Sequence, residues 1–270
     1  METITLRELL QAVQGTLLTP ESPLDTPIFR VDTDSRTIHP GALFIPLVGD
    51  RFDGHAYINA ALESGAVGCL TARERESYRE DKFYVKVANT QRALRDLAAW
   101  YKARFDIPFV AVTGSVGKTT AKDMIAAVLG TRFRVLKTEG NFNNNIGLPL
   151  TILLLDRTVQ VCVLEMGMDR PGEIDYLADI VRPDVGIITN IGDAHIERLG
   201  SRENIFKAKC ELLPRRGVKS VVKSHGPTVV VQLKLVLLSA HEDGGIRGVA
   251  VKCLDITKNP DCEGSLPDRN

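Results

Sequence analysis

A short segment near the middle of the chain combines the residue types that bind phosphate groups. It follows an apolar run at 109–112, and small and hydroxylated residues surround a single lysine: Thr113, Gly114, Ser115, Val116, Gly117, Lys118, Thr119 and Thr120. Glycines let backbone N–H groups crowd around an anion at a helix N-terminus, the lysine can reach terminal phosphates, and a threonine hydroxyl can complete a Mg²⁺ shell. The segment therefore predicts a loop that binds a nucleoside triphosphate.

This loop departs from the usual phosphate-loop pattern at its first glycine. The pattern places a glycine five residues before Gly117, where this chain has Val112, and the first glycine is Gly114 instead. An ordinary glycine turn between a strand and a helix is the alternative interpretation. Packing alone would not require lysine and threonine at 118–120 after such a turn. We therefore expect a shortened phosphate-binding loop.

Polar side chains also follow later apolar runs. Glu165 comes directly after 161–164, where a carboxylate can hold Mg²⁺, and His195 lies just beyond 185–188. Residues 141–145 contain four asparagines, which favour a structured loop that presents amides. A solvated strand end for Glu165 and a structural role for His195 are the alternatives. Since parallel strands end at one edge of a sheet, we expect these groups to face one crevice.

Alternating strands and helices are needed to position these groups. Apolar runs predict strands at 109–112, 134–138, 161–164 and 185–188, and helices are predicted after the loop, from 171 and from 201. The helix after the loop is predicted to bury one apolar face, made of Ala121, Met124, Ile125, Val128 and Leu129. The fold class predicted is α/β, with a mostly parallel sheet.

The first part of the chain, residues 1–87, is predicted to be a separate small α/β domain. Thr5 and Glu8 form a capping box, so a helix should begin at Leu6 and end near Gly15. A helix capped by Asn89 should connect this domain to the phosphate-loop domain at 88–213. Residues 214–270 are interpreted as an atypical tail.

Two polar segments of the N-terminal domain are candidate binding sites. Ser35 and Arg36 put a hydroxyl beside a guanidinium, which suits a phosphate or a carboxylate. Residues 51–55, which include Asp53, Gly54 and His55, form a loop rich in hydrogen-bonding groups. A solvated turn is the alternative for each segment.

The composition favours a globular protein without a polyanionic partner. The 34 basic and 34 acidic residues cancel, so bulk charge gives no case for nucleic acid or an anionic membrane. No apolar stretch is long enough for a membrane span, and the N-terminus lacks a leader pattern, so we expect a cytoplasmic protein. The cysteines are scattered without metal-ligand spacing, which argues against disulfides and zinc: Cys69, Cys162, Cys210, Cys253 and Cys262.

Taken together, these motifs resemble those of the Mur ligases. The matching segments occur in the family's order, at 113–120, 140–144, 165–167, 189–197 and 208–211. Residues 34–36 and 49–55 resemble the family's N-terminal UDP-sugar-binding domain. The resemblance covers about residues 1–213.

The resemblance implies an ATP-dependent amide ligase of peptidoglycan precursor synthesis. Its substrates would be UDP-N-acetylmuramoyl-tripeptide and D-alanyl-D-alanine, joined through an acyl phosphate by a chain expected to be a monomer. It implies that Lys118 and the loop amides bind the ATP phosphates, that Thr119 and Glu165 hold one Mg²⁺, and that His195 holds a second metal ion. Lys209 would be carbamylated and become a metal ligand. The catalytic residues implied are Lys118, His195 and Lys209, and the substrate-binding residues implied are Ser35, Arg36, Asp53, Gly54, His55, Asn141 and Asn144.

The resemblance leaves alternatives for the activity. After Leu213 the family pattern is lost, as after truncation or a shifted reading frame, so this chain is expected to be inactive or impaired by itself. A folylpolyglutamate synthetase type of ligase is a second possibility, although that relative usually has glycine where this chain has Thr119. A non-catalytic module that binds a nucleotide or a UDP-sugar is the third.

Overall fold

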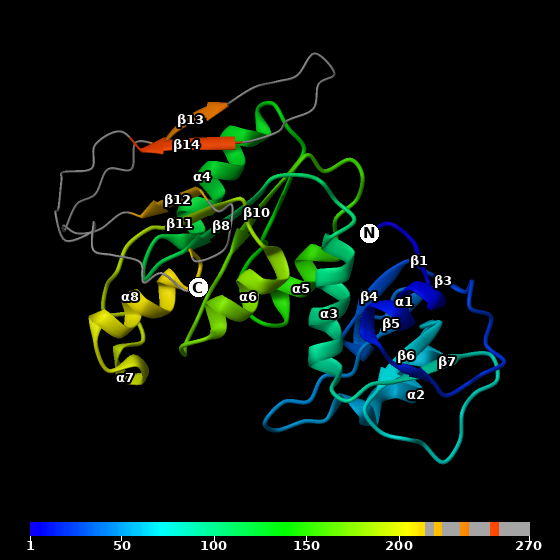
Figure 1. Ribbon diagram of the computed structural model, residues 1–270. Coiled ribbons are helices and arrows are strands. Elements are labelled where there is room, and N and C mark those ends of the chain that lie inside the picture. The colour runs from blue at the N-terminus through cyan, green and yellow to red at the C-terminus, as the bar shows by residue number, and fades with distance from the viewer. Residues whose placement is uncertain (214–218, 223–232, 238–248, 254–270) are drawn as a thin grey trace, which may run out of the picture.

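The chain folds around two five-stranded sheets with a long helix between them (Figure 1). The computed structural model describes residues 1–213, 219–222, 233–237 and 249–253. Most of the segment interpreted as an atypical tail, Cys262 included, lies outside the described residues. Within the described part, no helix is both long enough and apolar enough to cross a membrane.

The N-terminal sheet has the strand order β2-β7-β6-β5-β4. Strands β4 to β7 run parallel to their neighbours, and β2 is antiparallel to β7. The strands are β2 (Thr16–Leu17), β4 (Arg30–Asp32), β5 (Ala42–Phe44), β6 (Gly68–Thr71) and β7 (Phe83–Lys86). The other elements are α1 (Leu6–Val13), α2 (Ile58–Glu63), the short pair β1 (Ile4–Thr5) and β3 (Pro27–Ile28), and the 3-10 turns η1 (Ser35–Thr37) and η2 (Gly54–Tyr57).

The start of α1 confirms the predicted capping box. The Thr5 hydroxyl accepts the Glu8 amide at 3.3 Å, and the Glu8 carboxylate accepts the Thr5 amide at 2.8 Å. The helix ends at Val13, and Gln14 follows in the left-handed region with φ of 49°. Two of the amides left without partners in the first helical turn are thus satisfied reciprocally.

The second sheet is wholly parallel, with the order β12-β11-β8-β10-β9. Its strands are β8 (Phe109–Thr113), β9 (Val135–Lys137), β10 (Val161–Glu165), β11 (Val185–Ile188) and β12 (Lys219–Val222). Its helices are α4 (Lys118–Gly130), α5 (Gly147–Ile152), α6 (Glu173–Val181), α7 (Ile196–Leu199) and α8 (Arg202–Cys210). The predicted parallel sheet is therefore confirmed, but it also takes in β12, which we had placed in the tail. Strands β13 (Leu233–Leu237) and β14 (Val249–Cys253) form an antiparallel pair.

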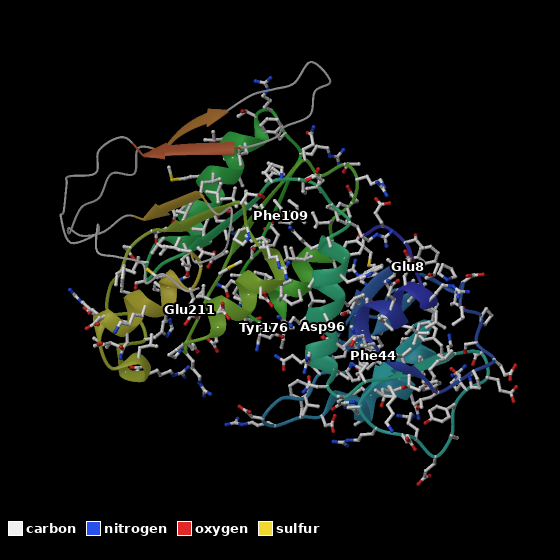
Figure 2. The ribbon with its side chains drawn as sticks, in the orientation of Figure 1. Glu8, Phe44, Asp96, Phe109, Tyr176 and Glu211 are labelled. Carbon is white, nitrogen blue, oxygen red and sulfur yellow. The ribbon has the colours of Figure 1, made fainter. Side chains whose placement is uncertain are left out.

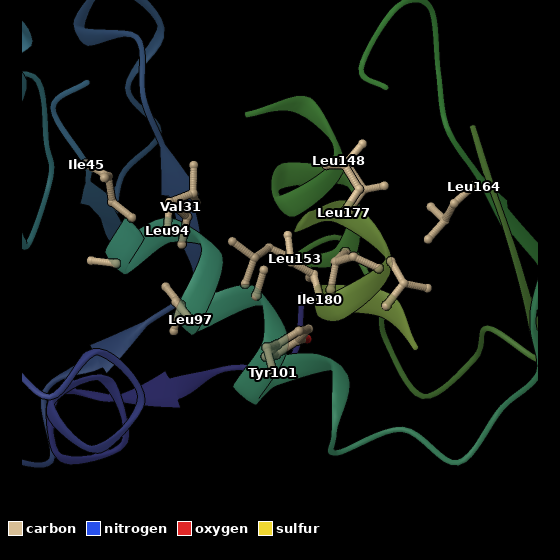
Figure 3. Packing of buried hydrophobic residues seen from close by; sticks show 14 of the residues in the cluster. Val31, Ile45, Leu94, Leu97, Tyr101, Leu148, Leu153, Leu164, Leu177 and Ile180 are labelled. Atoms are coloured by element: carbon tan, nitrogen blue, oxygen red, sulfur yellow. The ribbon is translucent and has the colours of Figure 1, made fainter. Parts of the chain in front are cut away.

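The long helix α3 (Thr90–Lys102) begins, as expected, after Asn89, whose side chain accepts the Arg92 amide at 2.8 Å. It packs on α1 toward one sheet and on α5 and α6 toward the other. Figure 3 shows Leu94 and Leu97 of this helix within a core that also holds Val31 of β4 and Ile180 of α6. One continuous apolar core therefore connects the two sheets.

The predicted apolar face of α4 is partly wrong. Ile125 and Leu129 are buried, but the side chains of Met124 and Val128 are more than half exposed. Lys122 is buried instead, and its ammonium group donates to the Thr138 carbonyl at 2.8 Å. The helix therefore turns a partly polar stripe toward the sheet, because a buried lysine can be retained when its head group finds an acceptor.

Candidate phosphate-binding and metal site

The larger of two clefts, about 1190 Å³ against about 730 Å³, contains several of the predicted site residues. Lys118, Asn144 and His195 line it, at the carboxyl ends of the parallel strands. β8 and β11 are neighbours in the sheet. The next strand in sequence after β8 is β9, at one edge of the sheet, and the next after β11 is β12, at the other edge. Ligands of open α/β sheets bind at such a switch point.

The predicted phosphate-loop residues lie together between β8 and the first turn of α4: Gly114, Ser115, Val116, Gly117, Lys118, Thr119 and Thr120. Gly114 has φ of 150° and Gly117 has φ of 79°, so both positions favour glycine. The Lys118 ammonium donates to the Gly114 carbonyl at 3.0 Å. Val112 is fully buried in β8, so the strand continues through the position where the usual pattern has a glycine, and the loop is short for that reason.

Glu165, the last residue of β10, is buried next to this loop's strand. Its Oε1 accepts an N–H from the Asn143 side chain at 2.8 Å, while its Oε2 is buried without a hydrogen-bond partner within the described part of the chain. A buried carboxylate oxygen without a partner is costly unless a cation or a water occupies the space beside it. Glu165 therefore fits the role of a metal ligand.

His195 lies at the mouth of the cleft, seven residues after the end of β11. It adopts a left-handed conformation with φ of 63°. Its ring Nδ1 is 3.2 Å from Oδ1 of Asp169, and Oδ2 of the same carboxylate accepts from Arg198 at 2.6 Å. Asp169 thereby orients the imidazole and leaves Nε2 for another partner.

Lys209 on α8 is buried, with 2% of its surface exposed. Burial, and then the positive charge of Lys118, lower the pKa of the Lys209 amine to about 8. Burial disfavours the charged form of an amine, and a nearby like charge adds to the effect. At pH 7 about a tenth of this amine is therefore uncharged.

The asparagine loop contributes through a residue that the sequence reasoning did not select. Asn143 contacts Glu165, whereas Asn144 accepts the amides of Ile146 and Gly147 at 3.0 and 2.9 Å and holds the turn into α5. Asn141 is exposed. The residue type predicted a structured loop, but it could not tell which asparagine faces the sheet.

The predicted N-terminal site residues line a different part of the molecule. Arg36, next to Ser35, pairs with Asp34 through Nε at 2.9 Å and Nη2 at 2.6 Å, and this hydrogen bonding lowers the pKa of Asp34 to about 2. Asp34 lines a second cleft of about 730 Å³ between β4 and α4, on which Lys137 and Phe142 also lie. Ser35 and Arg36 themselves line neither this cleft nor the larger one.

The second N-terminal segment is held by its own hydrogen bonds. Asp53 caps η2 and contacts the His55 Nδ1 at 2.7 Å and Arg73 at 2.7 Å. The His55 Nε2 accepts the Ala72 amide at 3.0 Å, so both ring nitrogens are used within this unit. Gly54 is buried against the Leu47 backbone, where a Cβ would lie 2.6 Å from the carbonyl oxygen.

The far wall of the larger cleft was missed by the sequence reasoning. Arg92 and Arg95 at the start of α3 line it, together with Tyr176 of α6. The Arg95 guanidinium lies 5.0 Å from the centre of the Tyr176 ring and pairs with Asp96 and Asp179. Figure 2 shows Asp96 and Tyr176 side by side where the two helices meet. Ordinary helix patterning gave no signal for these residues.

Two family models match the chain. One, described as the Mur ligase middle domain, matches residues 112–228, and the other, described as the Mur ligase family catalytic domain, matches residues 27–102. The first match runs beyond residue 213, where we expected the resemblance to end.

Curated relatives match the same region. A UDP-N-acetylmuramoyl-tripeptide--D-alanyl-D-alanine ligase of Bacillus subtilis (strain 168) is 46% identical over 209 residues, which are 77% of this chain and 46% of that protein. The protein of that name from Escherichia coli (strain K12) is 37% identical over 221 residues, which are 81% of this chain and 47% of that protein. The chain thus spans about half the length of the curated relatives it matches.

Solved structures agree with this match. A crystal structure of MurF from Acinetobacter baumannii superposes with a TM-score of 0.76 at 31% identity, over 94% of this chain and 61% of that one. MurF ligase from Thermotoga maritima, solved in complex with ADP, superposes with a TM-score of 0.65 at 36% identity, over 72% of this chain and 45% of that one.

Proposed function

The chain belongs to the Mur ligase family, and from this premise we propose that it takes part in the ATP-dependent joining of D-alanyl-D-alanine to UDP-N-acetylmuramoyl-tripeptide. The observation that carries the proposal is the cleft at the strand ends, which Lys118 and His195 line together with Asn143, the residue that contacts the buried carboxylate of Glu165. The relative from Thermotoga maritima was solved in complex with ADP, which supports nucleotide binding by this chain. The reaction belongs in the cytoplasm, where ATP and UDP-linked precursors are available.

The side chains at this site fit a Mg²⁺ ion that takes only some of its ligands from the protein and the others from the substrate. No cluster of three histidine, cysteine or acidic side chains that could form a protein cage occurs among the described residues. The Thr119 hydroxyl and the orphaned oxygen of Glu165 would hold one ion, whose other ligands would be phosphate oxygens and water. His195 and Lys209 would hold a second ion. These ions would supply neutralisation of the charge on the transferred phosphoryl group.

Lys209 can act as a metal ligand only after chemical modification of its amine. An ammonium group repels cations, but the uncharged amine can attack carbon dioxide, form a carbamate and release a proton. The lowered pKa of Lys209 provides the uncharged amine near neutral pH, and the resulting carbamate would offer oxygen ligands. Carbamylation of Lys209 is therefore part of the proposal.

The chain's own residues would bind and orient the phosphates. The amides of the first turn of α4 and the Lys118 ammonium would hold the triphosphate, so the terminal phosphoryl group faces the cleft. The acceptor carboxylate would take that group, giving ADP and an acyl phosphate. The amine of D-alanyl-D-alanine would then attack the acyl carbon, with loss of phosphate and a proton.

We assign the UDP-sugar to the N-terminal segments. Ser35 and Arg36 on η1, and Asp53 with Gly54 and His55 at the start of η2, would form its binding surface, together with Asn141 and Asn144 of the asparagine loop. Because Arg36 is already paired with Asp34, an anionic ligand would have to share or replace that pairing. This makes Arg36 a weaker anchor than an unpaired guanidinium.

The test is incubation of the purified chain with UDP-N-acetylmuramoyl-tripeptide and Mg²⁺-ATP in the presence of hydroxylamine. An acyl phosphate is trapped as a hydroxamate, which mass spectrometry detects without any need for the second step. A parallel reaction contains D-alanyl-D-alanine and is examined for the pentapeptide product. Hydroxamate that depends on ATP and on the tripeptide supports the proposal.

Thermal shift separates the remaining alternatives. Stabilisation by the UDP-linked tripeptide and by Mg²⁺-ATP, but not by folates, is the expected pattern. Stabilisation by folates instead would favour a folylpolyglutamate synthetase type of ligase. Binding of both ligands without any hydroxamate would favour a binding module.

A further inference from the structure

The phosphate loop is tied to the loop that follows β11 through one asparagine. The side-chain oxygen of Asn190 accepts the amides of Ser115 at 3.1 Å and Val116 at 2.9 Å. The Ser115 amide also lies 3.1 Å from the Asn190 backbone carbonyl. One carboxamide thus satisfies the amides at the first bend of the loop.

Two further contacts reinforce this connection. The Thr189 hydroxyl donates to the Val116 carbonyl at 2.7 Å, and the Ser115 hydroxyl accepts the Gly192 amide at 2.9 Å. Residues 189–192 therefore hold 115–116 through hydrogen bonds on both sides of Asn190. We call these contacts the loop latch.

The latch divides the loop's amides into two sets. Those of Ser115 and Val116 point to Asn190, whereas the first turn of α4 leaves its N–H groups without intrahelical partners. Intrahelical bonding begins with the Ala121 amide, which donates to the Gly117 carbonyl at 2.9 Å. The phosphate-binding donors are therefore those of 117–120.

Gly114 gives independent evidence for close contact between the loops. A Cβ at this position would lie 1.9 Å from the Thr189 hydroxyl oxygen. By contrast, a Cβ at Gly117 would have no heavy atom within 4 Å. The unusual position of the first glycine is thus explained by the approach of Thr189.

The side chain at position 190 has to be an amide rather than a carboxylate. An amide oxygen accepts the two N–H groups without a net charge, whereas an aspartate in the same place would put a negative charge beside the phosphates. The latched segment continues to His195 at the cleft, so the same frame positions the phosphate loop and the imidazole.

We propose that Asn190 is a positioning residue that fixes the first bend of the phosphate loop, an inference that rests on the proposed nucleotide binding. Asn190 stays bonded to Ser115 and Val116 when nucleotide binds. Phosphates then engage only the donors of 117–120. Asn190 thereby couples nucleotide binding to the loop that carries His195.

Amide hydrogen exchange of the full chain, measured by NMR with and without Mg²⁺-ATP, tests the latch. In the parent, the Ser115 and Val116 amides should be protected in both states. In Asn190→Ala the exchange of the Val116 amide should accelerate by about tenfold or more without nucleotide, because its acceptor is gone. The Ser115 amide should be affected less, because it keeps the backbone carbonyl of residue 190 as an acceptor. Loss of their protection in the parent when nucleotide binds would overturn the proposal.

Calorimetry on the same variants provides the second readout. Asn190→Ala should weaken Mg²⁺-ATP binding by about tenfold, and Asn190→Asp should also weaken it while keeping the two amides protected. Asn59→Ala, which changes an exposed asparagine on α2, is the matched control and should bind nucleotide as the parent does.

Tighter nucleotide binding by Asn190→Ala would mean that Asn190 blocks the site, which contradicts the proposal. Failure of the parent to bind nucleotide would refute the proposed function, while the exchange data without nucleotide would still decide on the latch.

Discussion

At the scale of single residues, the candidate site is distinguished by ionisable side chains that the fold buries. Glu165 has one carboxylate oxygen held by Asn143 and one with no partner among the described residues. Lys209 is buried with a lowered pKa. Isolated buried groups of this kind reduce stability, so their presence together is typical of a binding site rather than of a core.

We predict that Glu165→Gln removes the Mg²⁺ dependence of ATP binding without reducing stability. The amide keeps the side chain's shape but carries no charge, and it relieves the burial of an uncompensated carboxylate oxygen. The free energy of unfolding without metal should stay the same or rise by about 1 kcal/mol. Thermal unfolding with ATP, with and without Mg²⁺, checks this, and the exposed Glu21→Gln is the control. A variant stabilised by Mg²⁺-ATP as much as the parent would remove Glu165 from the metal site.

At the scale of elements, the loops at the strand ends are fixed by contact with each other. We predict that Gly114→Ala destabilises the chain more than Gly117→Ala does. Both positions have positive φ, but only the methyl group at 114 would collide with Thr189, at 1.9 Å. Gly117→Ala should cost about 1 kcal/mol of backbone strain, and Gly114→Ala should cost more. Denaturant unfolding of both variants measures the difference.

A double substitution checks the cause of that difference. Adding Thr189→Ala removes the colliding oxygen, so the pair Gly114→Ala with Thr189→Ala should recover part of the loss, although the Thr189 backbone nitrogen would still lie 3.1 Å from the new methyl group. Strictly additive effects of the two substitutions would show that the collision does not cause the loss.

The capping box of α1 gives a second prediction for an element. Thr5→Ala should lower the free energy of unfolding by about 1 kcal/mol, because the Glu8 amide loses its acceptor. Thr3→Ala, at an exposed neighbouring position, should have little effect. Equal stability of both variants in urea would show that the box does not stabilise the helix.

The sequence predicted elements well where a pattern has one physical meaning. Buried parallel strands read as continuous apolar runs, so β8, β10 and β11 were predicted close to their observed bounds. The face of α4 was wrong for Met124 and Val128, because apolar spacing cannot tell that Lys122 finds a carbonyl acceptor inside. Selecting Asn143 required knowing which side chain faces Glu165, and that depends on how the loop is folded.

At the scale of the whole molecule, α3 and one tyrosine join the two sheets. The Tyr101 hydroxyl donates to the Leu155 carbonyl at 2.6 Å and accepts the Glu2 amide at 2.6 Å. Burial raises the pKa of Tyr101 to about 12. The N-terminal segment before β1, the long helix and the segment after α5 therefore meet at one buried hydroxyl group.

We predict that Tyr101→Phe lowers the free energy of unfolding by about 1–3 kcal/mol, because it leaves a buried carbonyl and a partly buried amide without a partner. Tyr57→Phe, at a half-exposed tyrosine, is the control and should change stability little. Denaturant unfolding measures both. A loss no larger than that of the control would show that water replaces the hydroxyl group.

The central claim is that the short loop after β8 binds the phosphates of ATP through Lys118. The most direct measurement is calorimetric titration of Mg²⁺-ATP into the parent, Lys118→Ala and Lys207→Ala, an exposed lysine of α8 that serves as the control. The parent and Lys207→Ala should bind, whereas Lys118→Ala should lose binding or bind far more weakly, with unchanged thermal unfolding. Equal affinity of Lys118→Ala and the parent would contradict the central claim.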